Sequence, residues 1–262
     1  YLNLARFFLN ERGQADRHNL RGPYQQDHLP VTEQTEAVGH AVRAAYMYAG
    51  MADVAALTGD AAYLHAIDAL WEDVVQRKLY LTGGIGAERH GEAFGPAFYL
   101  PNAEAYAETC AAIANALWNH RMFLLHGDAK YIDVLERTVY NGFLAGVSLQ
   151  GNTFFYPNPL AANGHERFNQ GEAERAPWFG CSCCPVNVVR FIPSLPGMQY
   201  AVQESKLYVN LFAGGTAEME VAGRTVEVRQ ETRYPWDGAV RMTLRPGQAT
   251  TFHLAVRIPG WA

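Results

Sequence analysis

Hydrophobic residues recur at helical spacing over most of the first 150 residues. Apolar side chains three and four positions apart predict amphipathic helices over residues 1–11, 35–57, 61–77, 103–125 and 129–147. Polar stretches that contain glycine and proline separate these helices and predict loops, the longest at residues 14–34 and 83–101. The first part of the chain is therefore predicted to be mainly α-helical, with long loops.

An internal repeat relates two pairs of these helices. The segment Leu57–Leu64 aligns with Leu125–Ile132, an offset of 68 residues (57 to 125), and each segment carries Gly-Asp between two helices. The glycine can end one helix in the left-handed conformation, and the aspartate can cap the next. Repeated helical hairpins bury their faces against their neighbours. We therefore predict a barrel of paired helices with a cleft at one end; an open helical solenoid is the alternative.

After Pro196 the pattern changes to short alternating or β-branched runs between glycine and proline turns. Such runs predict antiparallel strands of a β-sandwich, over residues 206–212, 215–221, 225–232, 239–244 and 250–258. Two domains follow from this change. Residues 1–195 form the helical domain, and residues 196–262 form the start of an incomplete antiparallel β-sandwich.

Composition and charge limit the class of protein. The 262 residues are 49% hydrophobic, which is enough for a large core, and the net charge is −5. Because no run of basic residues occurs, we expect neither nucleic acid nor a membrane as a partner. No apolar run approaches the roughly 18 residues of a membrane span, and no signal peptide opens the chain. Four cysteines are too few for a disulfide scaffold, so we expect a reducing compartment, the bacterial cytoplasm rather than secretion.

Three of the four cysteines lie in one short stretch, residues 178–187, and the fourth is Cys110, two positions after Glu108. Thiolates and carboxylates are ligands that zinc accepts, and the adjacent Cys183 and Cys184 are poorly placed for a disulfide. These four residues therefore predict a metal site, with buried free thiols as the alternative. Side chains at i and i+2 do not share a helix face, so joint ligation by Glu108 and Cys110 requires an irregular helix end.

Other candidate residues lie in loops or at helix ends. Glu92 follows Gly91 in the loop between the repeats, where a carboxylic acid beside aromatic residues can act as a general acid; a solvated loop glutamate is the alternative. His40 begins a helix face after a long loop, a common place for a histidine with only a structural role. Tyr156 and Trp178 could line a sugar site, although aromatic residues more often pack in a core.

Six short motifs occur together in the helical part: Thr82–Gly86, Gly91–Glu92, Leu100–Asn102, Glu108–Cys110, Tyr140–Gly142 and Trp178–Pro185. Two more, Thr232–Gly238 and Arg257–Trp261, follow in the strand region. Together they resemble glycoside hydrolase family 127, the β-L-arabinofuranosidases, over nearly the whole chain. The resemblance implies an (α/α)6 barrel, of which residues 1–195 would be the C-terminal part, followed by the start of a β-sandwich.

The same resemblance implies a function and a set of site residues. The activity would be that of a retaining glycoside hydrolase releasing L-arabinofuranose from β-L-arabinofuranosides, with Cys183 as nucleophile and Glu92 as general acid and base. Four residues would hold zinc, namely Glu108, Cys110, Cys183 and Cys184. Three would contact the sugar, namely His40, Tyr156 and Glu108. The expected partner is a carbohydrate, and assembly into a homodimer is compatible with the resemblance.

Two other classes of function stay open. A sugar-binding or scaffold protein would hold a structural zinc in a closed cage without access for a substrate. Another sugar-active enzyme on the same barrel, such as an epimerase or a lyase, would not need adjacent cysteines. We also expect Cys183 and Cys184 to differ, because neighbouring side chains diverge and Pro185 restricts Cys184 towards extended conformations.

Overall fold

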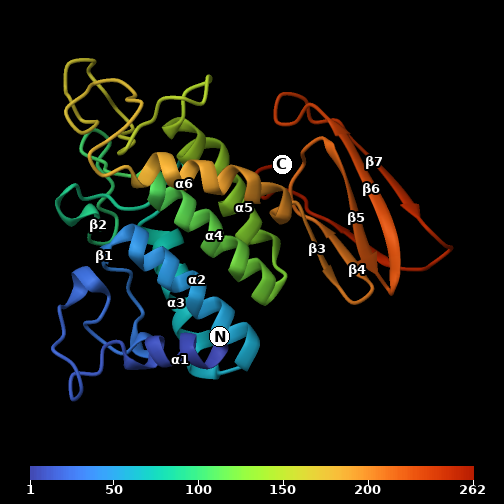
Figure 1. Cartoon of the computed structure of the whole chain (residues 1–262), viewed down its shortest axis with the longest axis horizontal. Coiled ribbons are helices and arrows are strands. Elements are labelled where there is room, and N and C mark those ends of the chain that lie inside the picture. The colour runs from blue at the N-terminus through green and yellow to red at the C-terminus, as the bar shows by residue number, and fades with distance from the viewer. The chain divides into compact units, whose positions relative to one another are not determined.

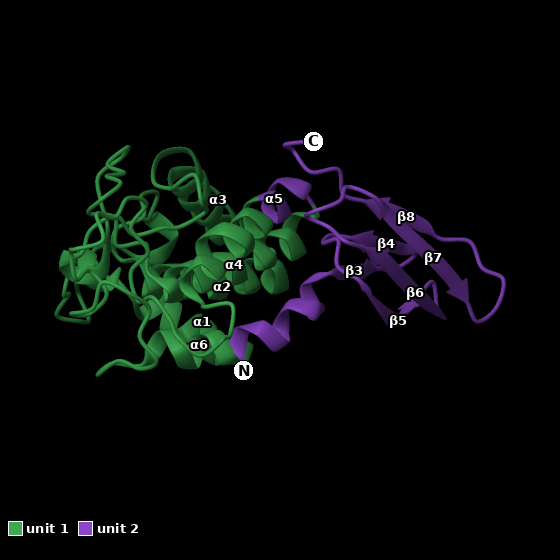
Figure 2. Ribbon diagram, turned by 90° about the horizontal axis from the view of Figure 1, so that it is seen from above, with its two compact units in different colours: residues 1–127, 134–189 green, residues 128–133, 190–262 purple.

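The computed structural model describes all 262 residues, which form two compact units (Figures 1 and 2). The first unit comprises residues 1–127 and 134–189, and the second comprises residues 128–133 and 190–262. The first is mainly helical, whereas the second contains two three-stranded sheets. No helix is both long enough and apolar enough to cross a bilayer.

Six α-helices account for most of the regular structure before residue 192. They are α1 (Leu2–Glu11), α2 (Ala41–Thr58), α3 (Ala61–Arg77), α4 (Thr109–His126), α5 (Ala129–Arg137) and α6 (Cys183–Phe191). The chain continues directly from α5 through a π-helix, Thr138–Phe143, and a 3₁₀ turn, Leu144–Gly146. Further 3₁₀ segments are Pro23–Gln25, Val31–Glu33, His90–Glu92 and Ile192–Met198. Each of the five predicted helices has a counterpart, and α3 has the predicted bounds. The helix predicted over residues 129–147 is α-helical only to Arg137, and α6 was not predicted.

The two Gly-Asp junctions end and begin helices as predicted. Gly59 and Gly127 follow α2 and α4 in the left-handed conformation, with φ of 66° and 71°. Asp60 and Asp128 each accept a hydrogen bond at 3.0 Å from the backbone N–H two residues later. Both α2 and α4 span 18 residues. The internal repeat is therefore a repeat of structure as well as of sequence.

The starts of α2 and α4 differ from the prediction, because each helix begins six residues later. Before α2, residues Gly39–His40 form β1, which pairs with β2 (Ala93–Phe94). Before α4, the N–H groups of Tyr106 and Ala107 donate to the carbonyl groups of residues 87 and 86, at 3.2 and 2.8 Å. These pairings with distant segments prevail over the helical pattern of the sequence.

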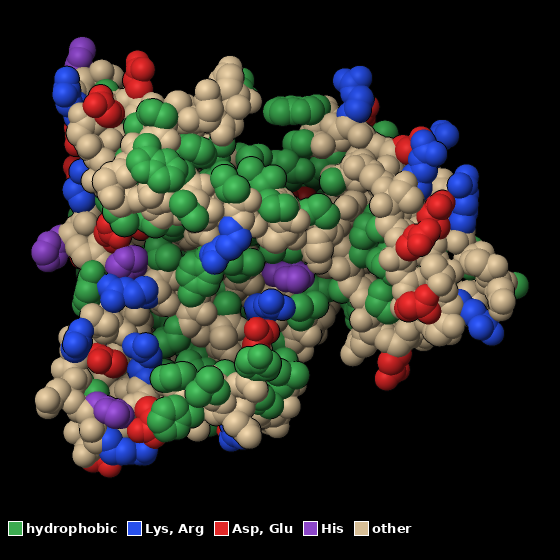
Figure 3. Space-filling model, in the orientation of Figure 1, with side chains coloured by type: hydrophobic (Ala, Val, Ile, Leu, Met, Phe, Trp, Pro, Cys, Tyr) green, Lys and Arg blue, Asp and Glu red, His purple; other side chains and the backbone are tan.

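Buried aromatic residues join α2, α3 and α4. Tyr48 of α2 and Trp118 of α4 are fully buried, with ring centroids 5.0 Å apart. Trp71 of α3 donates its indole N–H to Asn119 of α4 at 2.8 Å. The helices α2 and α4 lie side by side, with β1, β2 and the loop before α6 at the end where both begin (Figure 1). Several large apolar side chains of the helices remain exposed, and basic and acidic side chains are interspersed on the face shown in Figure 3.

The second unit contains six strands in two sheets. They are β3 (Tyr200–Gln203), β4 (Lys206–Val209), β5 (Gly215–Val221), β6 (Arg224–Thr232), β7 (Val240–Pro246) and β8 (His253–Val256). The sheet orders are β3-β4-β8 and β5-β6-β7. Leu207 of β4 shares a buried cluster with Val221 of β5 and Val226 of β6, so the two sheets pack face to face.

Two features of these sheets were not predicted. The strand β3 was missed, and β8 pairs with β4 in parallel, with Leu207 opposite Leu254. The prediction of a purely antiparallel sandwich is therefore wrong for this pair. Parallel neighbours need a long connection, and here the whole β5-β6-β7 sheet lies between β4 and β8 in the sequence.

Candidate active site

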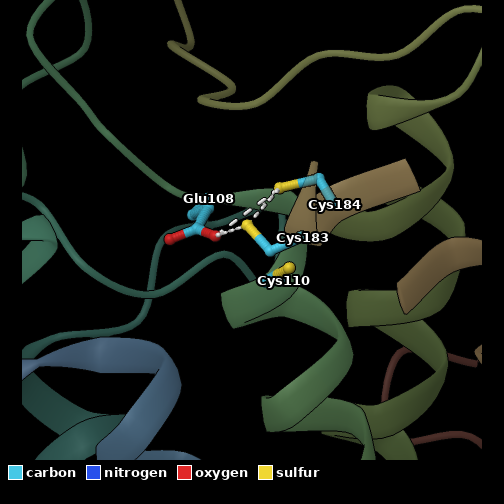
Figure 4. A group of neighbouring side chains, drawn as sticks. All are labelled: Glu108, Cys110, Cys183 and Cys184. Atoms are coloured by element: carbon cyan, nitrogen blue, oxygen red, sulfur yellow. Dashed lines mark hydrogen bonds between the residues drawn. The ribbon is translucent and has the colours of Figure 1, made fainter. Parts of the chain in front are cut away.

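Four side chains with metal-binding atoms meet where α4 and α6 begin (Figure 4). The ligand atoms of Glu108, Cys110, Cys183 and Cys184 all lie within 4.8 Å of one another. Glu108 directly precedes α4, and Cys183 and Cys184 are the first two residues of α6. Glu108 has a non-helical backbone, with φ of −59° and ψ of 140°. This is the irregular helix end that joint ligation with Cys110 requires.

The contacts within this cluster leave a carboxylate oxygen without a partner. Oε1 of Glu108 lies 3.6 Å from the sulfur of Cys183 and 3.5 Å from that of Cys184, and the two sulfur atoms are 3.9 Å apart. Oε2 of Glu108 is buried and has no hydrogen-bond partner. A buried polar atom without a partner is costly. The other oxygen, Oε1, faces the sulfur atoms (Figure 4), so Oε1 and the three thiols are the donors that fit a bound metal ion.

Helix N-termini and mutual hydrogen bonds favour a thiolate at Cys183. The first N–H groups of α4 and α6 lack intrahelical acceptors and carry partial positive charge, which stabilises a nearby thiolate. The hydrogen bond from Cys110, followed by that from Cys184, lowers the pKa of Cys183 far below its usual value. Burial raises the pKa values of Glu108 and Cys184. The helix N-termini and the two hydrogen bonds thus both favour the thiolate form of Cys183.

Cys183 is the accessible member of the four. Glu108, Cys110 and Cys184 are buried, whereas Cys183 is only partly buried. Its sulfur lies 3.0 Å from the hydroxyl oxygen of Tyr156, within hydrogen-bond distance. A small molecule can therefore approach Cys183 but not Cys184.

The start of α4 fixes the segment that carries Tyr156. The backbone N–H of Thr109 donates to the carbonyl oxygen of Tyr156 at 2.9 Å, and its hydroxyl donates to that of Phe155 at 2.7 Å. The first of these bonds also satisfies the N–H group of Thr109, which has no acceptor within the helix because it lies in the first turn of α4. Phe179 packs edge-on against Tyr156, with ring centroids 5.5 Å apart. Its neighbour Trp178, a candidate for lining the site, is 61% exposed.

A second cluster holds Glu92. The Nε2 atom of His40 lies 3.0 Å from Oε2 of Glu92, and the hydroxyl of Tyr106 donates to Oε1 at 2.8 Å. Burial, followed by the charge of Arg43, lowers the pKa of His40. Burial, followed by the hydrogen bond with Glu92, raises the pKa of Tyr106, so its hydroxyl keeps its proton. The carboxyl group of Glu92 is thus held from both of its oxygens.

The local fold brings Glu92 to His40. Gly91 and Glu92 both have positive φ, of 72° and 51°, and the chain then enters β2, in which Ala93 is paired with His40 of β1. A positive φ is unfavourable for a glutamate and is found mainly where the surrounding structure imposes it, often at functional sites. The turn directs the Glu92 side chain across the two-stranded sheet to the imidazole of His40.

Glu108 belongs to both clusters. Its carboxyl oxygen and the ligand atoms of His40 and Glu92 also lie within 4.8 Å of one another. The structure therefore brings together seven of the residues singled out in the sequence, namely His40, Glu92, Glu108, Cys110, Tyr156, Cys183 and Cys184. No hydrogen bond or ring contact joins the eighth, Trp178, to them.

A cavity lies beside these clusters and is not formed by them. It has a volume of about 840 Å³ and is lined by residues that include Tyr24, Gly39, His90 and Gly91. Gly39 and Gly91 immediately precede His40 and Glu92. The cavity therefore borders the turn and strand that carry these two residues.

Two family models match this chain. Residues 1–197 match the family model described as the GH127 catalytic domain of beta-L-arabinofuranosidases, and residues 206–262 match that of the GH127 middle domain. The chain belongs to glycoside hydrolase family 127. The family resemblance expected from the sequence motifs is thereby confirmed, and the fold is part of the GH127 fold.

Several arabinofuranosidases are similar to this chain over its whole length. A non-reducing end beta-L-arabinofuranosidase of Bifidobacterium longum subsp. longum is 35% identical, over 100% of this chain and 44% of its own. A solved GH127 beta-arabinofuranosidase is 56% identical, with a TM-score of 0.92, and 39% of that chain is covered. A GH127 beta-L-arabinofuranosidase from Geobacillus stearothermophilus T6 is 43% identical, with a TM-score of 0.93 and 44% coverage. The chain spans less than half the length of each.

Two features of this GH127 site differ from what the sequence predicted. Cys184 lies inside α6, so the prediction that Pro185 would hold it extended is wrong. A proline is tolerated in the first turn of a helix, where its missing N–H has no intrahelical acceptor to lose. Tyr106 was not singled out. The sequence predicted a helix over residues 103–125, whereas Tyr106 lies before α4 in a segment that pairs with residues 86–87.

Proposed function

We propose that the protein carrying this chain is a retaining glycoside hydrolase that releases L-arabinofuranose from β-L-arabinofuranosides. The observation that carries the proposal is the position of Glu108, whose carboxyl group contacts the sulfur of Cys183 and lies within 4.8 Å of the Glu92 carboxyl group. A nucleophile and a proton donor are thus neighbours. The names of the relatives, which are beta-L-arabinofuranosidases, support this sugar and this linkage.

Zinc is the metal that we propose for the site, held by Glu108, Cys110, Cys183 and Cys184. Three thiolates and one carboxylate are ligands of the types that zinc takes, and Oε1 of Glu108, which contacts the sulfurs of Cys183 and Cys184, supplies the fourth donor. When bound, the ion would stabilise Cys183 as a thiolate at neutral pH.

In the first step, the Cys183 sulfur attacks the anomeric carbon of the arabinofuranose. A carbon–sulfur bond forms while the bond from that carbon to the leaving oxygen breaks. Glu92, in its acid form, donates a proton to the departing oxygen and becomes a carboxylate. Most retaining glycosidases use a carboxylate as the nucleophile; here a sulfur atom takes that role.

In the second step, the Glu92 carboxylate takes a proton from a water molecule. The water oxygen attacks the anomeric carbon, the carbon–sulfur bond breaks, and Cys183 leaves as a thiolate. Glu92 is again an acid. Two successive inversions at the anomeric carbon retain its configuration. We also propose that His40, Tyr156 and Glu108 contact the sugar, in addition to their contacts with Glu92 and Cys183.

The accessibility of Cys183 favours an enzyme over a protein with a structural metal. A structural zinc site is closed by four buried ligands, whereas Cys183 is only partly buried and has Tyr156 beside its sulfur. An epimerase or lyase on the same fold would have no use for two adjacent cysteines at the site. The geometry supports a thiol-dependent hydrolase better than either alternative.

The proposed architecture is an (α/α)6 barrel followed by a β-sandwich. Residues 1–195 would form the C-terminal part of the barrel, and residues 196–262 the start of the sandwich domain. The two hairpins α2-α3 and α4-α5, repeated at an offset of 68 residues (41 to 109), support the barrel. The shared core of the two sheets supports the sandwich.

An assay of the protein carrying this chain tests the function. We expect release of nitrophenol from 4-nitrophenyl β-L-arabinofuranoside but not from its α-anomer. Proton NMR at early times should show β-L-arabinofuranose as the first product. Cys183→Ser should abolish turnover. Inversion of configuration, or full turnover by Cys183→Ser, would contradict the proposal.

A further inference from the structure

We infer that Tyr106 is a positioning residue that fixes the plane of the Glu92 carboxyl group for proton transfer. The inference rests on the proposed function and extends it to a residue that neither binds the metal nor touches Cys183. Its basis is the pair of contacts on Glu92. The hydroxyl of Tyr106 donates to Oε1 at 2.8 Å, and Nε2 of His40 lies 3.0 Å from Oε2.

Two contacts on different oxygens are needed to orient a carboxyl group. With a single contact, the group can still rotate about its last carbon–carbon bond. Glu92 lies in an exposed turn with positive φ, and its side chain is 30% exposed. The orientation of the carboxyl group therefore depends on Tyr106 and His40 acting together.

Tyr106 is itself held rigidly. Its side chain is 4% exposed, and its backbone N–H donates to the carbonyl oxygen of Ala87 at 3.2 Å. The next residue, Ala107, has a φ of 40° and donates to the carbonyl oxygen of Gly86 at 2.8 Å. A left-handed alanine is unfavourable. This strained turn joins the extended segment that presents Tyr106 to the residue that begins the metal site.

A second tyrosine makes a matching contact. Tyr156 packs against Tyr106, with ring centroids 6.1 Å apart, and its hydroxyl lies 3.0 Å from the Cys183 sulfur. Each of the two proposed reacting groups is therefore adjacent to the hydroxyl of one of two packed tyrosines. Removing the Tyr106 hydroxyl should loosen Glu92 and leave the contact on Cys183 in place.

The test compares leaving groups in the protein carrying this chain. For Tyr106→Phe, kcat/KM for methyl β-L-arabinofuranoside should fall by about 10- to 100-fold, because this leaving group needs a proton. For the 4-nitrophenyl glycoside, whose leaving group needs no proton, kcat/KM should change by less than about threefold. The control is Tyr80→Phe, which removes the hydroxyl of an equally buried tyrosine bonded to the carbonyl oxygen of Pro101 at 3.1 Å. Both rates should be unchanged in that variant.

A double-mutant cycle separates positioning from a general loss of structure. Once Glu92→Gln has removed the proton donor, adding Tyr106→Phe should change kcat/KM for the methyl glycoside by less than about twofold. Losses that multiply in the double variant, or equal losses on both substrates in Tyr106→Phe, would overturn the inference while leaving the proposed function intact. Failure of the unmodified protein to hydrolyse either glycoside would overturn both.

Discussion

His40 and Glu108 occupy equivalent positions in the two helical hairpins. Each directly precedes an 18-residue helix, α2 or α4, and the two positions are 68 residues apart (40 to 108). Their side chains nevertheless reach the same cluster, with ligand atoms within 4.8 Å of each other. Because α2 and α4 lie side by side and begin at the same end, the repeat brings equivalent residues together. Loops then add Glu92 and Tyr156.

The metal site predicts unequal effects of two cysteine substitutions. Cys110→Ser should reduce the bound zinc from about one per chain to a small fraction, because it removes one of four ligands. Cys181→Ser changes an exposed cysteine outside the cluster and should leave the zinc content unchanged. Elemental analysis of protein purified without added zinc measures both. Equal zinc contents in the two variants would contradict the proposed ligand set.

Covalent trapping distinguishes the two adjacent cysteines. A haloacetamide-bearing arabinofuranose analogue should label Cys183 alone among the cluster cysteines. Cys184 is fully buried, and the attacking atom must lie about 3–3.5 Å from the reacting carbon with its orbital aligned. Peptide mass spectrometry locates the adduct. An adduct on Cys184 or on Glu92 would refute the assignment of the nucleophile.

The helix cap at Asp60 predicts a local loss of stability. Asp60→Ala removes the hydrogen bond that the side chain accepts from the N–H of Ala62 at 3.0 Å. Loss of such a cap costs about 1 kcal/mol of unfolding free energy. Urea unfolding should show this decrease, whereas Asp60→Asn, which preserves the cap, should stay close to the parent. If both variants lose the same amount, the cap does not stabilise α3.

Acid sensitivity should depend in part on His120. Burial, and then the charge of Arg121, lowers its pKa from 6.5 to about 4. Between these two pH values the unfolded chain binds a proton that the folded chain does not bind. Stability therefore falls as the pH is lowered through this window, by about 2 to 3 kcal/mol, and is not affected by this group above pH 6.5.

The variant His120→Gln isolates this effect. Its unfolding free energy should decrease less than that of the parent between pH 6.5 and pH 4, whereas the difference between the two proteins should be constant above pH 7. Urea unfolding at a series of pH values gives both numbers. Parallel curves for the two proteins over the whole range would show that His120 makes no contribution.

The sequence predicts those features that depend on neighbouring residues. Gly59 and Asp60 end one helix and begin the next through their own backbone and side chain, so the hairpin turns could be predicted. The starts of α2 and α4 could not, because they depend on pairing with residues 93–94 and 86–87, which are far away in the sequence. The parallel pairing of β8 with β4 could not be predicted for the same reason, because the two strands are far apart in the sequence.

In the candidate site, too, some residues could be predicted from the sequence and others could not. The donors of the metal site could be found from residue type, since a Glu-x-Cys pair and adjacent cysteines are rare and chemically distinctive. Tyr106 could not, because an isolated tyrosine in a segment with helical character gives no sign of an extended backbone. Only the positive φ of Ala107 and the pairing with residues 86–87 direct its hydroxyl to Glu92.

Cys110 of α4 and Cys183 of α6 are 73 residues apart in the sequence (110 to 183). This separation constrains the order in which the protein folds. The cluster cannot form until the segment between Cys110 and Cys183 has folded back, and closing so long a loop costs entropy before any contact offsets it. During refolding, Cys184 should therefore react with an alkylating agent until this closure and be protected afterwards. Cys181, which remains exposed in the folded protein, provides an internal reference. The ratio of the two labels, followed over time, would mark the moment at which the helical unit is complete.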